Sequence, residues 1–262
     1  MQLYDGYIFD LDGTIYLGEK LLPGADRVIK ELREEGKGVM FLSNKPIETR
    51  YDYAAKLTRL GIPTDVANVI NSSFVLGQYL RHHAPDCLCY VIGEQALLDD
   101  LDEAGVRYTL EPEKIDYRVD YVVMAFDRTF HYGKLNRALQ CVKKGARLIA
   151  TNGDRTCPLE DGEIPDAGGI IGAVEGTSGK KVELIVGKPS PITVEVALDI
   201  LKVAPERCLM VGDRIETDIL MGNRFGLATA LVLTGVTDRE ILESSEIVPD
   251  YVLDSVADLR TR

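Results

Sequence analysis

Short apolar runs alternate with amphipathic stretches along most of this chain. Residues 7–9 and 38–42 are runs of apolar, largely β-favouring residues, which is typical of buried strands. Residues 24–35 carry apolar side chains at helical spacing, between a Pro-Gly opening and a glycine stop. Because strand and helix alternate in this way, the pattern predicts an α/β protein with a parallel sheet.

The same criteria predict elements over the rest of the chain. The predicted strands cover residues 7–9, 38–42, 87–92, 106–108, 120–126, 147–150, 183–186, 208–211, 227–233 and 251–253. The predicted helices cover residues 24–35, 46–60, 72–82, 94–104, 132–144, 170–179, 191–203 and 215–225. Residues 151–169 are rich in Gly, Pro, Asp and Thr and are predicted to form a long loop, a kind of segment that is usually functional.

Two strand–helix series follow one another, which predicts a core interrupted by an inserted domain. We expect a doubly wound, Rossmann-like core from residues 1–78 and 182–262, with an inserted α/β cap from residues 79–181. Gly77 and Gly179 lie near the junctions, and glycine tolerates the dihedral changes of a closing lid.

Composition limits the classes of function. The 262 residues are 45% hydrophobic and 27% charged, as expected for a globular enzyme, and the net charge is −12. This charge argues against nucleic-acid or anionic-membrane partners, but a bound cation can still attract a small anionic substrate. The first residues lack the pattern of a targeting segment, and no apolar run approaches the ~20 residues that span a bilayer. Five scattered cysteines predict a reduced, cytoplasmic protein.

Polar side chains follow four of the predicted strands. Asp10 and Asp12 follow the first strand, with Gly13 allowing a sharp turn. An Asp-Gly pair after a strand is often only a turn, and a calcium loop starting at Asp10 lacks its Gly and Glu. The other three ends carry Ser43 with Asn44, Lys188, and Asp213 with Asp218 beyond it. Since parallel sheets bind ligands at the carboxyl ends of their strands, this coincidence favours a cation and phosphate site over four turns.

These four segments resemble the motifs of the haloacid-dehalogenase-like superfamily of phosphatases. In order they are residues 9–14 (Phe-Asp-Leu-Asp-Gly-Thr), 42–44 (Leu-Ser-Asn), 187–189 (Gly-Lys-Pro) and 211–218 (Val-Gly-Asp-Arg-Ile-Glu-Thr-Asp). Essentially the whole chain resembles the NagD-like or p-nitrophenylphosphatase-like branch with a large α/β cap. Within this branch, the segment of residues 151–170 looks closest to AraL-type sugar phosphatases. Lys45 stands where many relatives carry a second Asn.

The resemblance implies a mechanism. Asp10 would attack phosphorus and form an aspartyl-phosphate, while Asp12 would protonate the leaving oxygen and then deprotonate water. Mg²⁺ would be held by Asp10, the main-chain carbonyl of Asp12, and Asp213, with Asp218 supporting that shell. The remaining implied contacts, to the phosphate oxygens, come from Ser43, Asn44 and Lys188.

Selection of the leaving group is expected to come from the cap. Asn152, Asp154, Gly168 and Gly169 are the candidates, since polar groups suit sugar hydroxyls. We therefore expect a phosphatase of small phosphomonoesters, with sugar phosphates preferred. Alternatives are a nucleotide or pyridoxal phosphate phosphatase, a phosphomutase or phosphotransferase, and a non-enzymatic binding module, which would be expected to lose Asp10 or Asp12. The sequence leaves open whether the protein forms a homo-oligomer.

Overall fold

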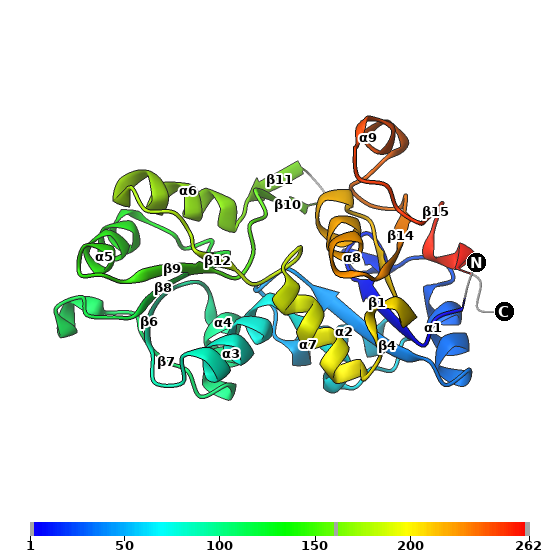
Figure 1. Ribbon diagram of the computed structural model, residues 1–262, viewed down its shortest axis with the longest axis horizontal. Coiled ribbons are helices and arrows are strands. Elements are labelled where there is room, and N and C mark those ends of the chain that lie inside the picture. Colours follow the sequence, from blue (N-terminus) through cyan, green and yellow to red (C-terminus); the bar gives the residue numbers. More distant parts are fainter. Residues whose placement is uncertain (1–2, 160–161, 260–262) are drawn as a thin grey trace. The chain divides into compact units, whose positions relative to one another are not determined.

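The computed structural model describes residues 3–159 and 162–259 (Figure 1). Contacts between Cα atoms divide the chain into two compact units. The first contains residues up to Ser43, Arg50–Ile70, and residues from Lys188 onward. The second contains Asn44–Thr49 and Asn71–Gly187. The division into residues 1–78, 79–181 and 182–262 stays a prediction.

The first unit is built on a six-stranded sheet with β1 (Gly6–Asp10) inside it. The strand order is β15-β14-β13-β1-β4-β5. The other strands are β4 (Gly38–Ser43), β5 (Val69–Asn71), β13 (Cys208–Gly212), β14 (Ala228–Val232) and β15 (Tyr251–Leu253). β1 pairs in parallel with both β4 and β13, and all five of its residues are buried. Burial on both faces explains why these strands appear in the sequence as continuous apolar runs.

Helices cover the sheet of the first unit. α1 (Ala25–Glu34) and α2 (Arg50–Arg59) contribute to an apolar cluster with alternate residues of the strands, including Tyr7, Phe9 and Phe41. α7 (Pro191–Leu201) contacts β4 and α8 (Leu220–Phe225) contacts β14. A short helix, α9 (Arg239–Ser244), follows β14 along the chain.

The second unit has its own five-stranded parallel sheet, in the order β12-β9-β8-β6-β7. These strands are β6 (Leu88–Ile92), β7 (Arg107–Thr109), β8 (Tyr121–Met124), β9 (Arg147–Ala150) and β12 (Leu184–Ile185). α5 (Tyr132–Lys143) and α6 (Ala167–Ser178) pack on one face, where they share an apolar cluster with the strands. α3 (Ser72–His83) and α4 (Gln95–Glu103) contact each other on the other face (Figure 1).

The predicted class, a doubly wound α/β protein with a second α/β unit, is confirmed. The long loop predicted at residues 151–169 is wrong in part. It contains an antiparallel hairpin of β10 (Thr156–Leu159) and β11 (Gly162–Pro165), and α6 already begins at Ala167. Prolines in both strands suppress the strand signal, because proline lacks the amide hydrogen that a sheet requires.

Other differences concern short elements. β5, the hairpin of β2 (Tyr16–Leu17) and β3 (Lys20–Leu21), and α9 were not predicted, because two to six residues leave little periodicity to detect. α2 begins at Arg50 and not at residue 46. Among the described residues, no helix is both long and apolar enough to cross a membrane.

Candidate active site

Three adjacent strands of the first unit end in the polar residues that the sequence singled out. β1 lies between β13 and β4, and Asp10 is in register with Leu42, one residue before Ser43. On the other side Phe9 is in register with Val211, and Asp213 follows directly after the end of β13. Because parallel strands bring their carboxyl ends to the same edge, Asp10, Ser43 and Asp213 meet there.

Lys188 bridges two of the carboxylates in this unit. Its ammonium donates hydrogen bonds to Asp10 Oδ1 and, over 2.6 Å, to Asp218 Oδ1. Lys188 is only 4% exposed. Burial by itself would lower the pKa of Lys188, but the charges of Asp10 and Asp218 outweigh burial and raise it. Lys188 therefore stays an ammonium, and its charge offsets part of the negative charge of the site.

The acidic cluster carries more negative charge than one lysine can balance. One oxygen each of Asp10, Asp213 and Asp218 lies within 4.8 Å of the others. Burial raises the pKa of Asp10, against the opposing effect of Lys188. Burial, together with the charge of Asp218, raises the pKa of Asp213 to about 6. Such shifts are typical of buried carboxylates that share one site, because like charges and loss of water both disfavour the ionised form.

The two carboxylate oxygens of Asp213 differ in their partners. Its Oδ2 accepts a hydrogen bond of 2.7 Å from the Val236 amide. Its Oδ1 is buried and has no hydrogen-bond partner within residues 3–159 and 162–259. A buried carboxylate oxygen without a partner is costly, and a divalent cation would satisfy it. The donor set, carboxylate oxygen only, suits a hard divalent cation such as Mg²⁺ better than zinc, which prefers nitrogen or sulfur.

Glycines make room for these carboxylates. A Cβ on Gly235 would lie 2.0 Å from Asp213 Oδ2, and one on Gly13 would lie 2.6 Å from it. A Cβ on Gly212 would lie 2.3 Å from the carboxyl carbon of Asp218. Gly13 was noted in the sequence only as a turn residue, and Gly235 was missed. Its Thr-Gly-Val context gives no local signal, because Asp213 is 22 residues away in the sequence.

A π-helical turn, Ile215–Ile219, places Asp218. Its carboxylate accepts a hydrogen bond of 3.1 Å from the Arg214 amide as well as the bond from Lys188. Single π-helical turns of this kind frequently occur at functional sites. Asp218 is completely buried, so its contacts with the other members of the cluster are shielded from solvent.

Asp12 is not one of the three clustered carboxylates. It is half-buried and takes part in an isolated bridge with Tyr16. Its side chain does not belong to the group of carboxylates whose oxygens lie within 4.8 Å of one another. The predicted roles of Asp12 in proton transfer and metal binding stay predictions.

Ser43 and Asn44 are adjacent in sequence but make contacts in different units. Ser43 Oγ donates a hydrogen bond of 3.1 Å to the Tyr53 hydroxyl within the first unit. Asn44 belongs to the second unit, where its Nδ2 donates to Asp154 Oδ2 over 3.1 Å. Its carbonyl accepts a bond of 2.7 Å from Ser72 Oγ. Their predicted contacts with phosphate stay predictions.

The candidate specificity residues form one network in the second unit. Asn152 is completely buried, and its Nδ2 donates to both Asp154 Oδ2 and Asp166 Oδ1, over 3.2 and 3.1 Å. Burial raises the pKa of Asp166. The sequence analysis did not identify Asp166 as a member of this network. Gly168, in the first turn of α6, donates its amide to the Asp154 carbonyl over 2.8 Å, and Gly169 donates to that of Asp166. This geometry shows how the segment is held together, and its role in selectivity stays a prediction.

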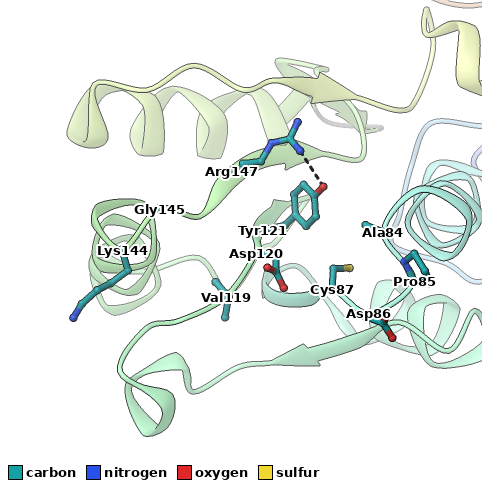
Figure 2. Close-up of a pocket in the computed structure, with 10 residues that line it drawn as sticks. All are labelled: Ala84, Pro85, Asp86, Cys87, Val119, Asp120, Tyr121, Lys144, Gly145 and Arg147. Carbon is teal, nitrogen blue, oxygen red and sulfur yellow. Dashed lines mark hydrogen bonds between the residues drawn. The ribbon is translucent and has the colours of Figure 1, made fainter.

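A hollow of about 590 Å³ lies at the opposite, amino-terminal edge of the second sheet. Figure 2 shows its lining, which includes Cys87, Asp120, Tyr121 and Arg147. Arg147 donates to the Tyr121 hydroxyl and pairs with Glu183. The charge of Arg147 is therefore already engaged, and Lys144 of the same lining is likewise paired with Asp116.

Comparison with known proteins agrees with this geometry. A family model described as haloacid dehalogenase-like hydrolase matches residues 7–107, and a second, HAD-hydrolase-like, matches residues 185–259. The sugar-phosphatase AraL of Bacillus subtilis is 42% identical over 254 residues, covering 97% of this chain and 91% of AraL. Chicken glycerol-3-phosphate phosphatase is 37% identical, over 97% of this chain and 90% of that protein.

Solved structures are similar over nearly their whole length. A 4-nitrophenylphosphatase from Thermotoga maritima has a TM-score of 0.91 and 35% identity, covering 97% of this chain and 95% of that one. NagD from Escherichia coli K-12 has a TM-score of 0.89 and 30% identity, with both chains fully covered. The chain therefore belongs to the haloacid dehalogenase-like hydrolase family and is a phosphatase of that family. Its relatives place it in the NagD-like branch, so the resemblance noted in the sequence is confirmed.

Proposed function

We propose that this protein is a Mg²⁺-dependent phosphomonoester hydrolase that acts on small phosphorylated metabolites, sugar phosphates above all. The observation that carries the proposal is the buried cluster of Asp10, Asp213 and Asp218 around Lys188. The similarity to a protein named sugar-phosphatase, over nearly the whole of both chains, supports the substrate class.

Asp10 is the nucleophile. A carboxylate oxygen of Asp10 forms a bond to phosphorus while the ester P–O bond breaks, which gives an aspartyl-phosphate. Lys188 holds Asp10 by a hydrogen bond and offsets charge that develops on the phosphoryl oxygens. Water then forms a new bond to phosphorus, the bond to Asp10 breaks, and phosphate leaves.

Asp12 moves the proton. It donates a proton to the leaving alkoxide in the first step and accepts one from the attacking water in the second. This role requires a carboxyl group that no cation holds, and the side chain of Asp12 stands outside the carboxylate cluster. Ser43, the Asn44 backbone and Lys188 bind the phosphate oxygens.

Asp10, Asp213 and the main-chain carbonyl of Asp12 hold the cation, with Asp218 supporting them. The buried Asp213 Oδ1 without a partner supports this assignment. When bound, Mg²⁺ supplies charge that stabilises the phosphoryl oxygens and lets nucleophile and substrate approach despite their like charges.

Residues 79–181 form the inserted cap, and the network around Asn152 and Asp154 selects the leaving group. Since the acidic cluster and Lys188 engage only phosphate, discrimination among substrates has to come from elsewhere in the chain. We place the protein in the cytoplasm, in accord with five cysteines that are all free and buried.

The test is release of inorganic phosphate from a panel of sugar phosphates, nucleotides, pyridoxal phosphate and p-nitrophenyl phosphate. We expect the highest kcat/KM on small sugar phosphates. Asp10→Asn should fold and lose nearly all activity, and Asp12→Asn should be severely impaired, because an amide cannot shuttle a proton. Near-normal turnover by folded Asp10→Asn would refute the covalent mechanism. Isomerised sugar phosphate without phosphate release would indicate a phosphomutase instead.

A further inference from the structure

A tyrosine of the core reaches the edge of the sheet where the phosphate is proposed to bind. Ser43, at the end of β4, donates a hydrogen bond of 3.1 Å from Oγ to the hydroxyl of Tyr53, in the first turns of α2. Tyr53 is 1% exposed and Ser43 is 5% exposed. Both residues belong to the first unit, so this contact lies within one body.

The surroundings of Tyr53 would suit a phenylalanine. Its ring belongs to the apolar cluster that also contains Phe9, Phe41 and Leu57. Placing a hydroxyl in such a cluster is costly unless the hydroxyl is hydrogen-bonded. Here it meets the side chain of Ser43, the last residue of β4. Packing alone therefore does not account for the hydroxyl, which makes a polar contact with Ser43.

We propose that Tyr53 is a positioning residue for the phosphate-binding hydroxyl of Ser43. This inference rests on the proposed function, in which Ser43 donates to a phosphate oxygen. A phenol can both donate and accept hydrogen bonds. When Ser43 Oγ turns its O–H to donate a hydrogen bond to a phosphate oxygen, the Tyr53 hydroxyl becomes the donor to Ser43 Oγ. The resulting chain, from phenol to serine to phosphate, orients Ser43 and strengthens its bond to the anion.

A double-mutant cycle tests the inference. The variants are Tyr53→Phe, Ser43→Ala and the combination of the two, and the ligand is inorganic phosphate with Mg²⁺, measured by calorimetry. Tyr53→Phe loses one hydrogen bond that orients a donor. We therefore expect this variant to bind phosphate about three- to tenfold more weakly than the wild-type protein. In the Ser43→Ala background the same change should have no further effect. With p-nitrophenyl phosphate, Tyr53→Phe should raise KM more than it lowers kcat.

Tyr7→Phe is the matched control. Tyr7 is fully buried in the same apolar cluster, and its hydroxyl accepts a hydrogen bond from the Tyr4 amide. Denaturant unfolding of both variants measures the purely structural effect of losing a buried hydroxyl. We expect Tyr7→Phe to leave phosphate binding unchanged even where its stability falls as much as that of Tyr53→Phe.

The outcomes separate this inference from the proposed function. An equal effect of Tyr53→Phe with and without Ser43, or an equal effect of Tyr7→Phe, would overturn the role of Tyr53. The same follows if Ser43→Ala leaves phosphate binding intact. Phosphate binding that follows the expected cycle in a protein that hydrolyses no phosphomonoester would overturn the proposed function alone. Absence of phosphate binding by the wild-type protein would overturn both.

Discussion

Lys188 and Asp218 form a fully buried ion pair, with 2.6 Å between Nζ and Oδ1. The side chain of Lys188 is 3% exposed and that of Asp218 is not exposed at all. The same ammonium binds Asp10, so it is shared between the proposed nucleophile and a carboxylate that supports the cation site. The geometry of the nucleophile and the electrostatics of the cation site are therefore coupled through one side chain.

Removal of this lysine should destabilise the fold. Lys188→Met leaves the buried carboxylates of Asp10 and Asp218 without their ammonium, and breaking a buried pair in this way costs about 3–5 kcal/mol. We expect the free energy of unfolding in urea to fall by about this amount in the presence of a chelator, and Mg²⁺ to restore part of it. The control is Lys202→Met, which removes a solvent-exposed pair with Asp199 and should have no measurable effect. Equal stability of the two variants would refute the coupling.

Gly235 should be required for the cation site. In Gly235→Ala a Cβ would fall 2.0 Å from Asp213 Oδ2, so the carboxylate or the loop has to move. Because supporting contacts of this kind typically change metal affinity 10- to 100-fold, we expect at least about a tenfold rise in the Mg²⁺ concentration for half-maximal activity. The matched control is Gly172→Ala in α6, where a Cβ meets nothing within 4 Å. An unchanged Mg²⁺ response in Gly235→Ala would contradict the prediction.

Chelation should abolish activity, and Mg²⁺ should restore it. The cluster offers only carboxylate oxygens, and no His or Cys belongs to it, so zinc should restore activity poorly. The measurement is phosphate release after exhaustive chelation, with the metal content verified by elemental analysis. Full activity in protein shown to be free of metal would eliminate the cation from the proposed function.

Changes in the Asn152 network should alter the ranking of substrates. Asn152→Ala removes the amide shared by Asp154 and the buried Asp166, and Asp154→Ala removes the partner of Asn44. We expect kcat/KM to change unequally across sugar phosphates, nucleotides and p-nitrophenyl phosphate. Asn152→Ala should also lose about 1–3 kcal/mol of stability, because a buried carboxylate keeps fewer donors.

The matched control for this network is Asn136→Ala, an exposed change on α5 of the same unit. It should leave both the ranking and the stability unchanged. If Asn152→Ala and Asp154→Ala lower every substrate by one common factor, the network positions the site but does not select the leaving group.

The sequence alone was sufficient for the class of fold and for the order of the four motifs. Continuous apolar runs such as residues 7–9 indicate strands buried on both faces, and a parallel sheet brings the ends of such strands to one edge. Asp10, Ser43 and Asp213 could be predicted as neighbours for this reason. Their pattern is local, since Asp10 and Ser43 end their strands and Asp213 follows directly after its own.

The tertiary structure decided which side chains complete the site, because those contacts join residues far apart in the chain. Lys188 meets Asp10 across 178 residues, and Gly235 makes room for Asp213 only where two loops approach each other. Neither the hydroxyl contact between Tyr53 and Ser43 nor the pairing of Asn152 with Asp166 leaves a periodic signal. Periodicity records which face of an element is buried, whereas the partner of a buried polar group depends on how separate elements pack.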